Sequence, residues 1–164
     1  NVYKQLKRLV RGFASHEEEV TKEDGTTEVV VKPNYSDDTI KVLGLFHDLS
    51  KADYYEQFFK NEKVYSENGS KRDSMGSYDW VSVPSYKIKE ASNRFLCADG
   101  ATNSFLLISQ YIPLTRVEIT ALLNANCGMD NGFSNKDLHA ILGSSPLTVL
   151  LHSADMISSY VQHI

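Results

Sequence analysis

The sequence predicts a mainly α-helical fold with two β-hairpin insertions. Several stretches repeat apolar residues at the three- and four-residue spacing of a helix face. Capping residues precede most of these stretches, and two polar stretches, at about residues 17–32 and 62–89, combine turn signals with strand-like runs. With 164 residues, 41% of them hydrophobic and 23% charged, the chain can bury a core of its own. We therefore expect a single domain over residues 1–164.

The opening segment is predicted to be an amphipathic helix followed by the first hairpin. Its apolar residues recur at helical spacing and its basic residues form the opposite stripe: Leu6, Leu9, Val10 and Phe13 against Lys4, Lys7, Arg8 and Arg11. Such a stripe is typical of a solvated helix surface, and facing a phosphate is the alternative. The turn signal Asp24-Gly25 and the run Val29–Val31 then predict the hairpin at about 17–32.

A central helix is expected to begin near Ser36, whose hydroxyl can cap free backbone amides. Its apolar residues leave almost no polar face, which predicts burial: Ile40, Val42, Leu43, Leu45, Phe46 and Leu49. We expect this helix to continue through Tyr54, Tyr55, Phe58 and Phe59. The second hairpin follows at about 62–89, with a loose tip around residues 66–77.

The rest of the chain is predicted to be helical. One helix is expected at about residues 103–111. Three pairs of residues mark the starts of later helices: Thr115 with Glu118, Ser134 with Asp137, and Ser145 with Pro146.

Charge and composition exclude several classes of protein. A net charge of -4 and a pI near 5.7 argue against a dedicated nucleic-acid surface, because phosphate backbones recruit basic surfaces. No apolar run approaches the roughly 20 residues of a membrane span. Cys97 and Cys127 stand far apart and fit no zinc or disulfide pattern, which indicates a reducing compartment such as the cytoplasm. Because the first residue is Asn1, we expect the sequence to start inside a longer gene product.

The pair His47-Asp48 stands inside the most apolar predicted helix. Burying a charged Asp beside a His is costly unless a partner compensates. Imidazole and carboxylate are normal ligands of Mn, Fe, Co, Ni or Zn, so a divalent metal is one such partner. Lys51, one turn after His47, could hold a phosphate near that metal. The alternative is a core histidine bonded to a carbonyl, with Asp48 paired with Lys51. Gly44, one turn earlier, would leave room for a ligand or a close helix.

A second His and Asp occur together in the last helix. His152 and Asp155 are three residues apart and share a helix face. One metal site formed by His47, Asp48 and Asp155 would satisfy all three groups. A structural pair between Asp155 and His152 is the competing interpretation.

Two motifs resemble the HD-domain superfamily of metal-dependent phosphohydrolases. Residues 42–55, VLGLFHDLSKADYY, look like the superfamily signature and are closest to small HD-domain proteins of bacteria and their phages. In that group a hairpin with Trp and Tyr follows, as at Trp80 to Tyr86, and a final motif like residues 151–156, LHSADM, completes the metal site. Asn1-Val2-Tyr3 resembles the residues just after the group's first metal-binding His.

The resemblance implies an HD-domain-like helical bundle around a divalent metal (Mn, Fe, Co, Ni, Mg or Zn). It implies metal ligation by His47, Asp48 and Asp155, with a fourth ligand just before Asn1. The family's two further His-containing stretches are matched here by residues 98–102 and 124–128, which contain no His. This departure indicates a single-metal site or a site without activity. Asp99 could substitute as a ligand or base, although a loop aspartate before Gly is commoner.

The leading hypothesis is a metal-dependent phosphohydrolase that cleaves a nucleotide or another small phosphoester. Asp48 and Lys51 are the candidate catalytic residues, and Lys51, Tyr54 and Tyr55 the candidate substrate-binding residues, with core packing as the alternative for both tyrosines. The second hypothesis is a degenerate, non-catalytic HD fold that binds a ligand or protein. A third is a phage-encoded assembly protein whose exposed hairpins mediate contacts. In each case we expect a cytoplasmic protein of a bacterium or a phage-infected host cell.

Overall fold

The computed structural model describes residues 1–94, 99–125 and 135–161. Contacts divide the chain into two units, residues 1–50 with 98–164, and residues 51–97, and each is described by itself. The single domain expected over residues 1–164 stays a prediction. Cys97, Cys127 and His163 lie outside the described residues.

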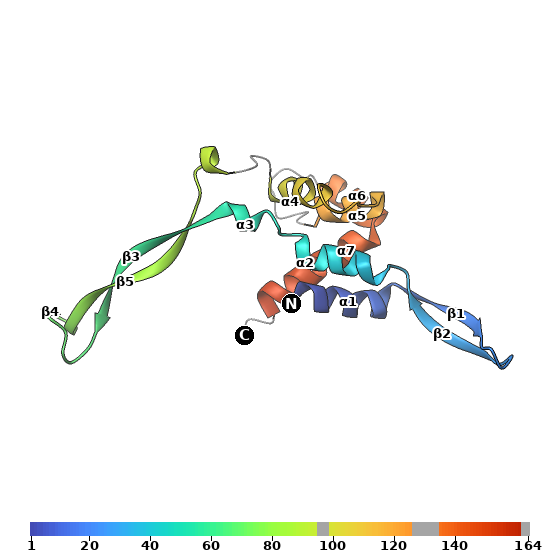
Figure 1. Ribbon diagram of the computed structural model, residues 1–164, viewed down its shortest axis with the longest axis horizontal. Coiled ribbons are helices and arrows are strands. Elements are labelled where there is room, and N and C mark those ends of the chain that lie inside the picture. Colours follow the sequence, from blue (N-terminus) through green and yellow to red (C-terminus); the bar gives the residue numbers. More distant parts are fainter. Residues whose placement is uncertain (95–98, 126–134, 162–164) are drawn as a thin grey trace. The chain divides into compact units, whose positions relative to one another are not determined.

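The first unit is built from helices and one hairpin (Figure 1). Its elements are α1 (Val2–Phe13), β1 (Ser15–Thr21), β2 (Thr27–Pro33), α2 (Asp37–Phe46), α4 (Gly100–Ser109), α5 (Arg116–Leu123), α6 (Asn135–Ser144), α7 (Pro146–Met156) and the π-helical turn η2 (Ile157–Val161). Helix α1 contacts both α2 and α7, and the three lie side by side in Figure 1.

Capping explains where the helices of this unit begin. The Ser36 hydroxyl accepts from the Thr39 backbone N–H at the start of α2, as predicted. Thr115 and Glu118 form the predicted reciprocal capping box of α5. Ser145 caps α7, with Pro146 in its first turn. The predicted helix at 103–111 instead begins at Gly100, because the carboxylate of Asp99 caps it.

The core of the first unit joins apolar residues from α1, α2, α5 and α7. The largest fully buried side chains in it are Leu6, Val10, Ile40, Leu43, Leu122, Leu147 and Leu151. The predicted central position of α2 is only partly correct, because Leu45 is exposed. Gly44 faces α1 so closely that an added Cβ would lie 2.6 Å from the Tyr3 Cα. Of the two roles expected for this glycine, the structure shows the close helix.

The hairpin of the first unit pairs β1 with β2 from Ser15↔Pro33 to Thr21↔Thr27. Its turn holds Gly25 at a φ of 83°, a left-handed conformation that favours glycine. The predicted bounds of 17–32 thus lie within two residues of the strands that form.

The second unit is an antiparallel sheet whose strand order is β3-β5-β4. It contains the short helix α3 (Lys51–Tyr54), the strands β3 (Tyr55–Tyr65), β4 (Lys71–Asp73) and β5 (Gly76–Ile88), and the 3₁₀ turn η1 (Ala91–Asn93). Strands β3 and β5 pair without interruption from Tyr55↔Ile88 to Tyr65↔Tyr78 and form the long ribbon of Figure 1.

The predicted fold class is wrong. The chain is not a mainly α-helical, HD-domain-like bundle with two hairpin insertions but a mixed α and β structure. Of the residues described, 48% are helical and 28% lie in two sheets of two and three strands.

The error arises mainly at residues 55–65. We predicted that a helix continues through Tyr55, Phe58 and Phe59, but these residues start β3 and pair with β5. Aromatic side chains fit a pleated strand at least as well as a helix, and cross-strand pairing decides between the two. The hairpin expected at 62–89 therefore begins seven residues earlier, at Tyr55. The tip expected to be loose contains β4.

Within residues 1–94, 99–125 and 135–161, no single helix combines the length and hydropathy needed to cross a membrane. One sharply bent pair, Asp137–Gly143 with Pro146–Val161, passes by length and composition alone.

Candidate metal centre

Three residues singled out by the sequence lie together in the first unit. The Nε2 atom of His47 is 3.5 Å from Oδ2 of Asp48 and 3.6 Å from Oδ1 of Asp155. One potential ligand atom from each residue lies within 4.8 Å of the other two. His47, Asp48 and Asp155 could therefore hold a metal ion together.

His47 and Asp48 owe their position to the end of α2. The helix stops at Phe46, and the backbone N–H of His47 still donates to the Leu43 carbonyl. A turn follows, in which the Ser50 backbone N–H donates to the buried Ser104 hydroxyl at 3.0 Å. The turn is thus tied to α4, and it places His47 and Asp48 at a helix end rather than inside a helix.

Asp155 comes from the last turn of α7. That helix packs Leu147, Leu151 and Ala154 into the core. This packing fixes the position of Asp155 along and around the helix axis. Directly after α7 the backbone continues as the π-helical turn η2, a conformation often found at functional sites. The Ser159 hydroxyl lies 3.4 Å from Oδ1 of Asp155.

The side chain of His47 is the unusual member of the group. It is only 7% exposed, and neither ring nitrogen has a hydrogen-bond partner among the described residues. A buried polar atom without a partner costs about 1–3 kcal/mol, so native proteins rarely keep one. Distances of 3.5 and 3.6 Å from Nε2 are too long for hydrogen bonds, which cluster near 2.9 Å.

The same distances suit ligands that share one ion. Metal–nitrogen and metal–oxygen bonds of about 2.0–2.2 Å at tetrahedral or octahedral angles separate neighbouring ligand atoms by roughly 3.0–3.6 Å. The carboxylates are 29% and 26% exposed at their side chains, so solvent could supply ligands beyond the three that the protein offers. An orphaned imidazole beside two carboxylates fits a divalent cation in its donor chemistry.

His152 does not belong to this group. Its Nδ1 lies 2.7 Å from the Ala125 carbonyl oxygen and donates to it. The alternative of a core histidine bonded to a carbonyl therefore describes His152 rather than His47. His16 and His139 are exposed.

Asp99 serves α4 rather than the candidate centre. Its carboxylate accepts from the backbone N–H groups of Ala101 and Thr102 and from the Thr102 hydroxyl. The Thr102 bonds, led by that of the hydroxyl, lower the pKa of Asp99 below its ordinary value. The cap of α4 is a role that neither interpretation of Asp99 from the sequence included.

The predicted phosphate- and base-binding residues lie in the second unit. Lys51 begins the separate helix α3 instead of continuing α2 for one more turn. Tyr54 packs edge-on against Tyr55, with ring centroids 5.5 Å apart, and the Arg94 guanidinium lies 4.3 Å from the Tyr54 ring centroid. Tyr55 is an exposed residue of β3. Core packing therefore does not describe Tyr55.

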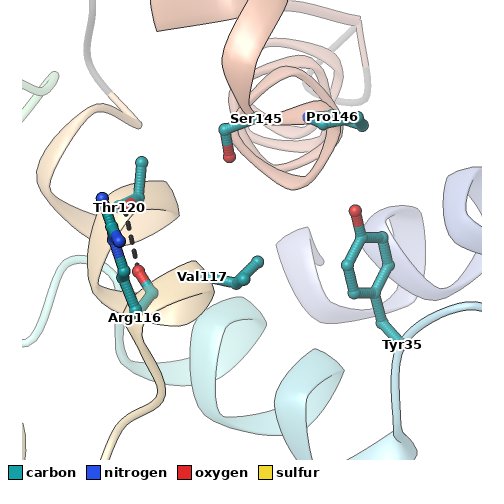
Figure 2. Close-up of a pocket in the computed structure, with 6 residues that line it drawn as sticks. All are labelled: Tyr35, Arg116, Val117, Thr120, Ser145 and Pro146. Carbon is teal, nitrogen blue, oxygen red and sulfur yellow. Dashed lines mark hydrogen bonds between the residues drawn. The ribbon is translucent and has the colours of Figure 1, made fainter.

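A hollow of about 450 Å³ lies elsewhere in the first unit and contains none of the predicted site residues. Figure 2 shows its lining, which comes from α5, the start of α7 and the segment before α2: Tyr35, Arg116, Val117, Thr120, Ser145 and Pro146. The Ser145 hydroxyl is already engaged with Thr148 in capping α7. The described residues of this lining include one guanidinium but no carboxylate or imidazole, so they do not supply the groups that hydrolysis requires.

Sequence reasoning missed the supports of the centre. Ser50 and Ser104 hold the turn that carries His47, and Tyr3 of α1 fills the space beside Gly44. Gly44 itself was the available signal for a close helix. No local pattern points to the contact of Ser104 with Ser50, because it joins residues distant in the sequence.

Comparisons with known proteins give no relative for this chain. No protein-family model matches it, no curated protein is similar to it, and no solved structure shares its fold at a significant level.

Proposed function

We propose that His47, Asp48 and Asp155 bind one divalent transition-metal ion. The unpartnered, buried imidazole of His47 between two carboxylate oxygens carries this proposal. Nitrogen and carboxylate donors together favour Mn, Fe, Co, Ni or Zn, while Mg prefers all-oxygen sites and is the weaker candidate.

The function that this centre supports best is metal-dependent hydrolysis of a small phosphoester, such as a nucleotide. When bound, the ion would lower the pKa of a water molecule and polarise a phosphoryl oxygen. Three protein ligands with open positions are typical of catalytic rather than structural metal sites. The motif resemblance around His47-Asp48 and Asp155 to HD-domain phosphohydrolases supports the same reaction class.

The protein's own side chains would position the ion, balance its charge and bind the substrate. The buried His47 has no freedom to rotate into solvent, so it would fix the ion's position, while Asp48 and Asp155 would balance its charge. Lys51, Tyr54 and Tyr55 stay predicted as phosphate- and base-binding residues. The cytoplasm stays the predicted compartment.

A non-catalytic binding module is the second candidate. The engagement of Asp99 in capping α4 favours it, because that carboxylate is thereby withdrawn from the role of general base. Both candidates share the metal site and differ in turnover.

The test combines metal analysis with a phosphatase panel. The purified chain is stripped with a chelator, titrated calorimetrically with Mn²⁺, Co²⁺, Ni²⁺ and Zn²⁺, and assayed with nucleotides and small phosphoesters. We expect binding of one equivalent of metal and metal-dependent turnover, both lost in Asp48→Asn. Asp38→Asn, a change at a highly exposed carboxylate in α2, serves as the matched control. Binding without turnover selects the non-catalytic module, and no binding of any of these ions refutes both candidates.

A further inference from the structure

The hairpin of β3 and β5 presents most of its aromatic residues on one face. Antiparallel register and period-two alternation place three cross-strand pairs towards the base, Tyr55·Ile88, Gln57·Tyr86 and Phe59·Pro84, and two towards the tip, Lys63·Trp80 and Tyr65·Tyr78, with Asn61·Ser82 between them. We call this the aromatic face. Ring contacts of Tyr78 with Tyr65 at 5.7 Å and with Trp80 at 6.0 Å confirm that these side chains share one side.

The aromatic face is exposed in the structure. Phe59 and Tyr86 are 68% and 69% exposed, and Tyr55, Tyr65, Trp80 and Ile88 are exposed as well. Large aromatic side chains each carry roughly 150–250 Å² of surface, so this face leaves roughly 600 Å² of mostly apolar side chain uncovered. That equals or exceeds the largest apolar patch usual on a monomeric protein, about 300–600 Å². Because β4 pairs only at the tip, the rest of the ribbon has two strands, and a two-stranded hairpin is marginally stable alone in water and needs packing on a face.

The opposite face of the same hairpin has a different composition. It carries the ion pairs Lys87–Glu56 at 2.9 Å and Lys60–Glu62 at 2.6 Å. On the aromatic face the one ionisable cation is Lys63, and Asp73 binds it at 2.8 Å. Depletion of charge and enrichment of Tyr, Trp and Phe characterise the centre of protein interfaces, whereas a single-stranded nucleic acid would require unpaired cations beside the rings.

We propose that the aromatic face is the interface of a homodimer, covered by the same face of a second copy of this chain. The order of the residue pairs supports this occupant. An aromatic cluster at the base and another at the tip flank the small polar pair Asn61·Ser82. A two-fold axis at that pair lays the base cluster of one copy on the tip cluster of the other, which is the self-complementarity that a two-fold interface requires.

Charge and area agree with a second copy. Because Asp73 neutralises Lys63, two aromatic faces meet without like-charge repulsion. Two copies together cover roughly 1,200 Å², the lower end of the range for specific interfaces, so we expect a dissociation constant on the order of micromolar.

The first test measures the oligomeric state of the full chain by sedimentation equilibrium across a concentration series. We expect a monomer–dimer equilibrium that the double variant Phe59→Ser, Tyr86→Ser weakens at least about tenfold. The matched control is Val64→Ser, Val81→Ser, two exposed residues of the opposite face of the hairpin, which should leave dimerisation nearly unchanged. Circular dichroism of both variants establishes that the fold is retained. A wild-type chain that stays monomeric up to about millimolar concentration, or equal effects of both variants, would overturn the proposal.

The second test examines the axis. In the dimer, Asn61 of each copy lies near the two-fold axis, so Asn61→Asp and Asn61→Lys each bring like charges together and should weaken self-association about tenfold. An equimolar mixture of the two variants should regain dimerisation, as heterodimers. A mixture that stays monomeric contradicts a two-fold axis at this pair. That result is expected if the aromatic face instead contacts a different protein or another part of the same chain.

Discussion

The Nε2 atom of His47 lies 3.6 Å from Oδ1 of Asp155, although the two residues come from the end of α2 and the last turn of α7. Helix packing brings them together: α1 contacts both α2 and α7, and all three contribute to one core. A cation bound there would link two separate helices of the folded state. Because the unfolded chain holds no such site, metal binding should appear as added stability.

Metal should therefore stabilise the wild-type chain but not Asp155→Asn. At a free metal concentration of about 100 times the dissociation constant, we expect about 2.7 kcal/mol of added stability. Denaturant unfolding with and without Mn²⁺ or Co²⁺ measures it. Asp137→Asn, in α6, is the control and should keep the full effect. An equal metal effect in Asp155→Asn would exclude this carboxylate as a ligand.

Substituting His47 by Leu separates a metal ligand from a structural ion pair. As a ligand, the unpartnered imidazole costs stability in the metal-free chain, so His47→Leu should leave that chain equally stable or up to about 1–3 kcal/mol more stable. The metal-dependent gain should vanish. If a protonated His47 instead bridges Asp48 and Asp155, breaking the pair would cost about 3–5 kcal/mol in chelator. Chemical denaturation of the variant in the presence of chelator shows whether its free energy of unfolding is maintained or increased, or is reduced.

Gly44→Ala should destabilise the first unit by about 1–3 kcal/mol, because the new Cβ would lie 2.6 Å from the Tyr3 Cα and force α1 and α2 apart. Gly12→Ala is the matched control, since nothing lies within 4 Å of its added Cβ and alanine favours the helix by about 1 kcal/mol. Thermal unfolding of both variants gives the comparison. A neutral Gly44→Ala would mean that α1 and α2 do not approach as described.

The ends of helices were predictable from the sequence, and the paired strands were not. Ser36, Ser145 and the box of Thr115 with Glu118 act through residues three positions away, so a local pattern contains the whole interaction. Tyr55 and Phe58 belong to a strand because β5 pairs with them, and their partners Ile88 and Ser85 lie more than twenty residues further along the chain. The alternation of Tyr55, Gln57 and Phe59 on one face is the local pattern that indicates a strand. The apolar content of the stretch favoured a helix instead.

The candidate metal centre was predicted better than the fold around it. His47, Asp48 and Asp155 were grouped because buried ionisable residues need a common partner, and that argument does not depend on fold class. The expected alignment of Lys51 with His47 assumed an unbroken helix, and α2 ends at Phe46 instead. The need of buried ionisable groups for a partner thus predicted which of these residues lie together. Helical spacing could not place Lys51, because α2 ends before it.

Thr39→Val should lower the stability of the first unit by about 1.5–3 kcal/mol, the usual contribution of a hydrogen bond to a charged group. The Thr39 hydroxyl donates to the buried carboxylate of Glu118 at 2.7 Å and so joins α2 to α5. Burial acts to raise the pKa of Glu118, but hydrogen bonds from Thr39 and Thr115 outweigh it and lower the pKa. Thr120→Val, which removes only a bond to the Arg116 carbonyl within α5, should change stability by less than about 0.5 kcal/mol. Equal losses in the two variants would contradict a special role of Thr39.

The tip of the second hairpin should respond to acid in a window set by Asp73. Its pKa is lowered from 3.8 to about 2, first by the hydrogen bond from Lys63, then by the Met75 backbone N–H and the Tyr65 hydroxyl, against an opposing effect of burial. Because the folded pKa is the lower one, the stabilisation is complete above pH 3.8 and is lost as the pH falls through about 2. Lys63, once released, would leave its place 5.7 Å from the Trp80 ring centroid.

Trp80 is the one tryptophan of the chain, so its fluorescence reports on this tip directly. We expect its emission to change as the pH falls from 4 towards 2 in the wild-type chain. In Asp73→Asn the change in this window should be absent. Asp79→Asn is the control, because the Asp79 carboxylate accepts from the backbone N–H and the hydroxyl of Ser70, and this variant should keep the transition. The same transition in Asp73→Asn would assign it to another carboxylate and disconnect Asp73 from the position of Lys63.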